Sequence, residues 1–295
     1  MKKFLTYFFC LVGLTIALML LFDRLYTSIC ENGNPRNKIQ YLIKMKAQEY
    51  DVVFLGSSRV ANHIDAQLFN TLSHRRTLNL GIEGAELNDN LLELSLLLKN
   101  NRTRFVFLEI DENLAFTAPS NVITAETMPY LQNEIISRHA QKYYPNYGLD
   151  WVPFYRYAIN DAEIGFRTVF FVATNKKPDV NLDSGYIPKQ GHKKSNAPRT
   201  KMGEGKAVGN NQALDEIKAI CKANHIELIL FIAPYCSKID PDEYITKIRK
   251  TDPDLLDLSK GYADSLFFNC RHLNDQGSKI LTRKLYEATK NKLAE

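Results

Sequence analysis

Two serines follow a short apolar run and are candidate nucleophiles. Residues 52–55 read Val-Val-Phe-Leu, and Gly56-Ser57-Ser58-Arg59 follow directly. Four consecutive apolar residues are typical of a strand buried on both faces. Ligands of open α/β sheets bind beyond the carboxyl ends of such strands, so a serine at this place can attack a substrate. The alternative is that both serines only cap the next helix, a role that suits serine.

The chain also holds the other parts that acyl transfer needs, namely a base and donors for an oxyanion. His272 stands between a predicted last strand, residues 264–268, and the terminal helix, and an imidazole is a suitable general base near neutral pH. Gly84 follows the second predicted strand, where a glycine lets its backbone N–H approach a substrate. Asn113 follows the third, and its side-chain amide can donate to an oxyanion, as can the Ser58 N–H.

Hydrophobic patterns alternate between strands and helices on both sides of an irregular middle. This alternation predicts an α/β fold with a doubly wound parallel sheet. The predicted strands are 52–55, 77–80, 104–110, 227–233 and 264–268, and the predicted helices are 38–50, 65–72, 88–99, 133–142, 163–174, 212–224, 242–250 and 274–293.

The first 24 residues predict a membrane anchor. Lys2 and Lys3 precede an uncharged run, residues 4–22, whose helical length is about 28 Å, close to the hydrocarbon thickness of a bilayer. The two lysines place the N-terminus in the cytoplasm and the rest of the chain outside, in the periplasm. A cleaved signal peptide is the alternative. We favour an uncleaved single-pass anchor, because no Ala-x-Ala site follows the run.

We therefore predict an anchor at 1–24, a juxtamembrane link at 25–50, and a domain at 51–295 with an insertion at 114–207. The insertion contains an aromatic cluster at 143–157, which either stacks on sugars or, as we favour, packs as core. Residues 175–207 form a long basic loop. We interpret it as a partly ordered loop near the site, against the alternatives of disorder or plain solvated charge.

Composition excludes some classes of function. The chain has 295 residues, 45% of them hydrophobic, and a net charge of +5, with no basic stripe of the kind that binds nucleic acid. The cysteines outside the anchor permit disulfides, but the sequence does not show which pair, and we favour buried unpaired thiols. Their spacing matches no zinc site, so neither a metal nor a cofactor is expected. These cysteines are Cys30, Cys221, Cys236 and Cys270.

Taken in order, these residues resemble the blocks of the SGNH (GDSL-type) esterase and lipase superfamily, over about 51–116 and 208–292. The Gly-Asp-Ser block matches Gly56-Ser57-Ser58, and the Asn-x-x-x-x-Gly block matches Asn79 to Gly84. The Gly-x-Asn-Asp block falls on 111–114, and the Asp-x-x-His block on 269–272. The resemblance implies a three-layer sheet with flavodoxin-like strand order, with Ser58 as nucleophile, His272 as base, and Gly84 and Asn113 at the oxyanion.

Asn269 occupies the position of the family's triad aspartate. An asparagine can accept a hydrogen bond from the histidine and hold its tautomer, but it cannot supply the charge that stabilises imidazolium. Three outcomes stay open: a slow Ser58–His272 dyad, replacement of the acid by Asp275 or Glu112, or a site that binds without turnover.

Three further residues have alternative interpretations. Arg59 either binds an anionic substrate group or pairs with a nearby carboxylate. We expect His63 to be a surface or capping residue and Glu109 to be a structural hydrogen-bond acceptor.

The Gly-Ser-Ser-Arg form behind an anchor resembles exported bacterial SGNH-like proteins of the cell envelope, some of which act beside membrane-bound O-acyltransferases. The expected function is that of a serine esterase or O-acyltransferase on acyl esters of an envelope glycan. The alternative is a weak or inactive accessory protein that binds such a polymer.

Overall fold

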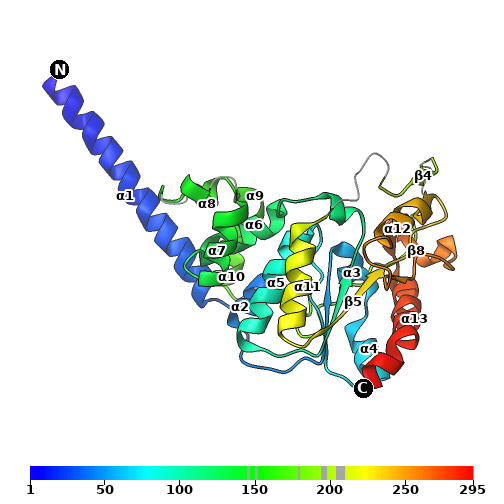
Figure 1. Ribbon diagram of the computed structural model, residues 1–295. Helices are drawn as coiled ribbons and strands as arrows, with labels where there is room; N and C mark the ends of the chain where they lie inside the picture. Colours follow the sequence, from blue (N-terminus) through cyan, green and yellow to red (C-terminus); the bar gives the residue numbers. More distant parts are fainter. Residues whose placement is uncertain (145–146, 150–151, 179, 194–197, 204–209, 295) are drawn as a thin grey trace. The chain divides into compact units, whose positions relative to one another are not determined.

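The computed structural model describes residues 1–295 except 145–146, 150–151, 179, 194–197, 204–209 and 295 (Figure 1). The chain divides into two compact units. We call Met1–Gln40 with Asn121–Pro178 the helical unit, and Tyr41–Ser120 with Asp179–Glu295 the sheet unit.

A parallel sheet of five strands forms the centre of the sheet unit. Its strands are β1 Val52–Leu55, β2 Thr77–Asn79, β3 Phe105–Glu109, β5 Glu227–Ile232 and β7 Leu256–Asp257. They lie in the order β2-β1-β3-β5-β7. Renumbered along the chain this order is 2-1-3-4-5, so the predicted flavodoxin-like topology is confirmed. The strand order reverses between β1 and β3, which makes their carboxyl ends the expected place for a ligand.

Two groups of helices cover the faces of this sheet, so the predicted three layers are confirmed. The helices α5 Leu87–Asn100 and α11 Gln212–Ala223 pack together, and α3 Ser58–His63, α4 Ala66–Ser73 and α13 Asp275–Ala294 form the other layer (Figure 1). Beneath the second layer, fully buried aromatic rings form the core, namely Phe54, Phe69, Phe107 and Phe231. Because β1 and β3 are buried along their whole length, the turns that follow them are held in fixed positions.

The prediction of a last sheet strand at 264–268 was wrong. A 3₁₀ turn occupies Asp264–Leu266, and β8 Phe267–Asn269 then pairs antiparallel with β9 His272–Leu273, outside the parallel sheet. The fifth sheet strand is β7, which sequence patterning missed because it is only two residues long. The antiparallel hairpin of β8 and β9, residues 267–273, carries His272, and we call it the histidine hairpin.

The remaining elements are short. They are α2 Lys38–Lys44, the 3₁₀ turn Glu112–Ala115, α12 Asp242–Ile248, and the parallel pair β4 Thr200–Lys201 and β6 Ile239–Asp240.

The helical unit is built on α1 Lys2–Asn32, which continues through residues that we had predicted as part of a link. Residues 23–32 stay helical because they pack against the rest of the unit. Arg156 forms an ion pair with Asp23 at 2.8 Å, and the Tyr130 hydroxyl donates to the Cys30 carbonyl at 2.8 Å. The other elements are α6 Asn121–Thr127, α7 Glu134–Tyr143, α8 Tyr155–Ala158, α9 Asp161–Ile164, α10 Phe166–Ala173, and the 3₁₀ turns Met128–Tyr130 and Tyr147–Leu149.

Two tyrosines of the predicted aromatic cluster at 143–157 pack as core, as we expected. Tyr144 and Tyr157 are 7% and 1% exposed, and the Tyr157 hydroxyl is hydrogen-bonded to Thr27. Trp151 lies outside the described residues.

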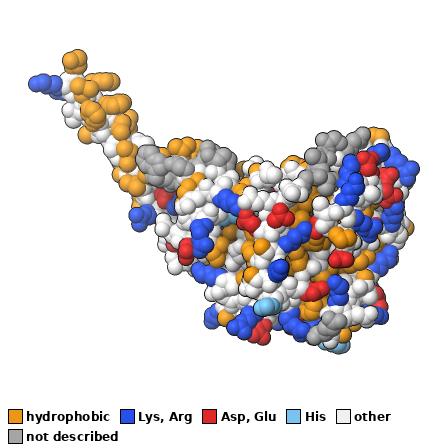
Figure 2. Space-filling view, in the orientation of Figure 1, with side chains coloured by type: hydrophobic (Ala, Val, Ile, Leu, Met, Phe, Trp, Pro, Cys, Tyr) orange, Lys and Arg blue, Asp and Glu red, His pale blue; other side chains and the backbone are white. Residues whose placement is uncertain are grey.

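The first two-thirds of α1 exposes its apolar side chains. Figure 2 shows hydrophobic side chains along this stretch and basic ones at its N-terminal tip. Among the described residues, α1 is the one helix long and apolar enough to cross a membrane, and a signal sequence meets the same criterion.

Candidate active site

Ser58 and His272 meet although 214 residues separate them. The Ser58 Oγ lies 2.8 Å from the His272 Nε2, and both side chains are partly exposed to solvent. The turn before Ser58 needs a glycine, because Gly56 has a φ of +151° and a Cβ there would lie 2.5 Å from Val60. Ser57 caps α3 by accepting a hydrogen bond from the Arg59 N–H at 3.3 Å. Ser57 therefore has the capping role, and the Ser58 hydroxyl, the candidate nucleophile, contacts the histidine.

Asn269 is the third member of this chain of hydrogen bonds. Its Oδ1 lies 3.0 Å from the His272 Nδ1 and also accepts the His272 backbone N–H at 2.9 Å. Because an amide oxygen only accepts, this contact places a proton on Nδ1 and leaves Nε2 free to take the serine proton.

The two carboxylates that we considered as substitutes are engaged elsewhere. Asp275 contacts Lys279 at 2.7 Å and accepts from the Tyr186 hydroxyl. Glu112 accepts the Gly203 N–H and lies 3.6 Å from Arg271. The hydrogen-bond partner of the His272 Nδ1 is thus Asn269, a neutral group.

Three expected oxyanion donors follow the ends of β1, β2 and β3, which are neighbouring strands. The Asn113 side chain is buried, and its Oδ1 accepts the Asp111 backbone N–H, while the Asn113 backbone N–H donates to the Asp111 carboxylate. The Asn113 Nδ2 has no partner among the described residues. The backbone N–H groups of Ser58 and Gly84 are also unpartnered within the described part of the chain, and Gly84 has a φ of +84°. A buried amide without an acceptor is costly, so the unpartnered Asn113 Nδ2 fits a donor that serves a ligand; Ser58 is half-buried and Gly84 is exposed, and solvent can reach them.

Arg59 does not have the substrate-binding role that we considered for it. Its side chain is 4% exposed, and its Nε donates to the Glu109 carboxylate at 2.9 Å. Its other N–H groups donate to the carbonyls of Ala233, Pro234 and Arg271, and the guanidinium lies 3.7 Å from the centre of the Tyr235 ring. The alternative of a carboxylate partner is the observed one, and Glu109 is the structural acceptor that we expected.

His63 is not the surface residue that we predicted, because it is fully buried beneath the histidine hairpin. Its Nε2 accepts the Leu273 backbone N–H at 3.0 Å, and its ring centre lies 6.0 Å from that of His272. Burial, together with the charge of Arg59, lowers the pKa of His63 well below its ordinary value, so the ring stays a neutral acceptor. One feature of the sequence could have indicated this position: His63 lies five residues after Ser58, on the same short helix.

A disulfide that the sequence did not reveal also holds the histidine hairpin. Cys236, in the segment after β5, is bonded to Cys270, which lies between Asn269 and Arg271. The Cys236 N–H also donates to the Cys270 carbonyl at 3.1 Å. Our expectation of buried thiols outside any disulfide was wrong for this pair, while Cys30 and Cys221 are buried and form no disulfide with a described residue.

One described part of the basic loop, residues 184–193, runs along the site, as we expected. We call residues 184–193 the strap. The Ile187 N–H donates to the Ala61 carbonyl, and the Lys193 N–H donates to the Phe268 carbonyl at 2.6 Å. Lys189 forms an ion pair with Glu83 at 2.7 Å, beside Gly84. The strap therefore connects α3 to the histidine hairpin and adds positive charge to the rim of the site.

The charges around His272 oppose its protonation. Burial, and then the positive charge of Arg59, lower the pKa of His272 to about 4, while Glu83 acts in the opposite direction. The imidazole is therefore neutral at pH 7 and able to accept a proton. It is also a weaker base than an ordinary histidine.

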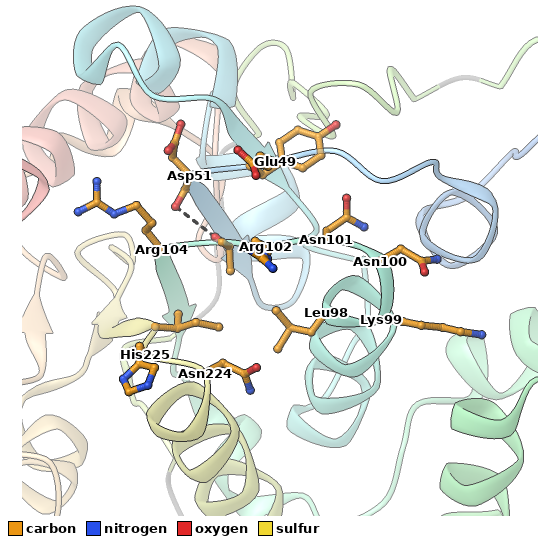
Figure 3. Close-up of a pocket in the computed structure, with 13 residues that line it drawn as sticks. Glu49, Asp51, Leu98, Lys99, Asn100, Asn101, Arg102, Arg104, Asn224 and His225 are labelled. Atoms are coloured by element: carbon orange, nitrogen blue, oxygen red, sulfur yellow. Dashed lines mark hydrogen bonds between the residues drawn. The ribbon is translucent and has the colours of Figure 1, made fainter.

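A cavity of about 730 Å³ lies at the other end of the sheet. Its lining includes Asp51, Arg104 and Ile226, which directly precede β1, β3 and β5 (Figure 3). It is therefore separate from the Ser58–His272 pair, which follows the carboxyl ends of the strands.

The fold and the candidate site together define an SGNH-like α/β protein. The chain has an α/β sheet of SGNH-like strand order, a serine after the first strand, and a histidine before the last helix. No protein-family model matches the chain, and no curated protein matches it significantly.

Three solved structures are similar at 12% identity each. The first is described as a lipolytic protein of the G-D-S-L family from Desulfitobacterium hafniense DCB-2 (TM-score 0.36, covering 80% of this chain and 97% of that one). The second is described as a platelet activating factor from Streptococcus pneumonia (TM-score 0.41, 96% and 99%). The third is a gut microbial diltiazem-metabolizing enzyme (TM-score 0.30, 84% and 49%). The roles of the site residues therefore rest on the geometry of this chain.

Replacing Asn269 with aspartate is expected to strengthen the base. The new charge beside the His272 Nδ1 raises the pKa of that imidazole by about 1–2 units and stabilises imidazolium, so ester turnover rises about tenfold or more. In a pH–rate profile, wild-type turnover increases as His272 loses its proton near pH 4 and is level at neutral pH. The Asn269→Asp profile has this acid limb at higher pH. Asp275→Asn is the control, and an unmoved acid limb would show that His272 is not the titrating base.

Breaking the disulfide is expected to loosen the histidine hairpin. The double variant Cys236→Ser/Cys270→Ser loses about 2–4 kcal/mol of unfolding free energy, as is usual for a native disulfide. It also loses most of its reaction with a serine-directed probe, since His272 is no longer held on Ser58. Urea unfolding and probe labelling measure the two effects, with Cys10→Ser as control. Full labelling of the folded double variant would contradict this role for the disulfide.

Proposed function

We propose that this chain is a membrane-anchored, exported serine esterase or O-acyltransferase that acts on acyl esters of a cell-envelope glycan. The observation that carries the proposal is the chain of hydrogen bonds from the Ser58 Oγ to His272 at 2.8 Å and from His272 to Asn269 at 3.0 Å. A serine hydroxyl bonded to an oriented neutral imidazole is the arrangement that nucleophilic acyl transfer requires.

The steps follow from this geometry. The Ser58 Oγ attacks the carbonyl carbon of the ester while the His272 Nε2 takes the hydroxyl proton. The Asn113 Nδ2 and the N–H groups of Ser58 and Gly84 donate to the oxyanion. The intermediate collapses to acyl-Ser58, and the leaving alcohol takes the proton from His272. Water or a sugar hydroxyl then attacks the carbonyl carbon of acyl-Ser58 and gives its proton to the His272 Nε2. His272 passes this proton to the Ser58 Oγ as the bond to the serine breaks, and the carboxylic acid or the acylated sugar leaves.

Positive charge on the rim supports an anionic or polar polymer as substrate. Arg271 is exposed within the histidine hairpin, and Lys189 and Lys193 lie on the strap. Side chains of this sign attract a polyanion before it reaches the serine. A membrane-bound O-acyltransferase that supplies acyl groups is the partner that fits the transfer reaction.

A non-catalytic accessory protein is the second candidate, and Asn269 favours it. The neutral amide leaves imidazolium without a counter-charge, and the pKa of His272 is already lowered to about 4. Such a protein would bind the polymer through the same rim without cleaving it.

Reaction with a fluorophosphonate separates these candidates. The full-length wild-type protein is expected to be labelled on Ser58 and to release acetate from acetylated glycan, and Ser58→Ala is expected to abolish both. Ser57→Ala is the matched control, because it loses only the cap of α3 and keeps the labelling. A wild-type protein that binds polymer but takes no label would establish the accessory role instead.

The packing of α1 supports a retained anchor over a cleaved signal. Asp23, Thr27 and Cys30 all contact the folded helical unit, so a cleavage site within residues 27–32 of this continuous helix would remove the contacts of Asp23 and cut the helix where it packs. An uncleaved helix of this kind holds the chain in the membrane with its N-terminus in the cytoplasm.

The mature protein is therefore expected to keep residues 1–32. With an N-terminal epitope, the protein should run near its full mass of 33.8 kDa and stay in the membrane fraction after carbonate washing. Arg156→Ala should lower stability, because it leaves Asp23 without its partner, and Arg138→Ala, an exposed arginine, is the control. Loss of the epitope from a soluble form would overturn the anchor.

A further inference from the structure

A groove of about 930 Å³ lies beside α1 within the helical unit. One wall is a single face of α1, because its residues follow helical spacing, and Leu131, Tyr147 and Arg156 contribute to the other. The α1 residues of the groove are Leu20, Asp23, Arg24, Thr27, Ser28 and Glu31.

The groove starts where the apolar run ends. Leu20 belongs to the run at residues 4–22, and Glu31 follows about 16 Å further along the helix. If α1 crosses the bilayer, as proposed above, the groove begins at the layer of lipid headgroups. The Cα–Cβ bonds of a helix tilt toward its N-terminus, so the Arg24 and Glu31 side chains both leave α1 inclined toward this layer.

The groove contains one engaged ion pair and two unengaged charges. Asp23 and Arg156 form the pair at 2.8 Å, and Arg156 also donates to Thr27. Both side chains of this pair are therefore held in place by contacts within the protein. Arg24 and Glu31 are exposed, and neither has an ion-pair or hydrogen-bond partner in the part of the chain that the structure describes. The unengaged positive charge therefore lies near the bilayer, and the negative charge lies two turns further out.

We propose that this groove binds the headgroup of a membrane phospholipid that carries both a phosphate and a primary amine, namely a phosphoethanolamine headgroup. Arg24 binds the phosphate, which is next to the glycerol, and Glu31 accepts hydrogen bonds from the ammonium beyond it. The four charged side chains sum to zero, which fits a zwitterionic headgroup better than an anionic one. A trimethylated amine has no N–H to give Glu31.

Native mass spectrometry of the full-length protein, released from nanodiscs of equal phosphatidylethanolamine, phosphatidylglycerol and phosphatidylcholine, tests the assignment. We expect retained phosphatidylethanolamine to exceed either other lipid. Arg24→Gln should lower its retention about tenfold, through loss of a charge-assisted hydrogen bond. Glu31→Gln should remove the preference over phosphatidylcholine. Arg138→Gln, an exposed change in the same unit, should retain lipid as the wild type does.

Further arms separate the alternatives. Competition by soluble glycerophosphoethanolamine would support headgroup recognition, and equal retention of all three lipids would overturn it. Stronger retention of phosphatidylglycerol, or a copurifying protein that Arg24→Gln releases, would also overturn it. Ser58→Ala should retain lipid unchanged, so an inactive esterase leaves this result standing. Loss of residues 1–32 from the mature protein would remove the site and overturn both the groove and the anchor.

Discussion

The buried guanidinium of Arg59 is the interaction on which the site depends. It lies one residue after Ser58 and contacts Glu109 at the end of β3, the Ala233 and Pro234 carbonyls after β5, and the Arg271 carbonyl in the histidine hairpin. Removing a cation from water costs several kcal/mol, so this arrangement is stable only because its N–H groups find acceptors. Those acceptors come from segments up to 212 residues away, and the ion therefore fixes them around the serine.

The same charge limits the base that it positions. Arg59 lies close enough to lower the pKa of His272, and Asn269 offers no negative charge in return. The hairpin itself is well held, by the disulfide to Cys236 and by the hydrogen bond from the Leu273 N–H to His63. Arg59 therefore contributes both to the position of the hairpin and to the low proton affinity of His272. A well-placed serine and histidine do not by themselves fix the rate of turnover.

Local signals in the sequence predicted the parts of the site, while distant pairings stayed hidden. The apolar run of β1, the glycine turn at Gly56 and the order of the motif residues pointed to Ser58 and His272 from patterns a few residues long. Nothing local distinguished a buried Arg59 or His63 from an exposed one, because their partners lie 50 and 210 residues away. Cys236 could have paired with any of several cysteines. Strand β7 was missed because two residues carry too little periodicity.

Neutral residues at two positions where the resembled family has aspartates reduce the negative charge close to Ser58 and His272. Ser57 and Asn269 stand where the resembled family has aspartates, and Arg59, Lys189 and Arg271 lie around the pair, with Glu83 as the carboxylate that acts on His272 in the opposite sense. The cations around His272 are paired with carboxylates, yet on balance burial and charge lower the pKa of His272 and so oppose a developing imidazolium. Of the two charges that develop in an acyl-transfer transition state, the site therefore offers hydrogen-bond donors to the oxyanion but an amide, not a carboxylate, to the imidazolium Nδ1. Asn269 is the position at which a carboxylate would change this balance most directly, because its side chain contacts the His272 Nδ1 at 3.0 Å.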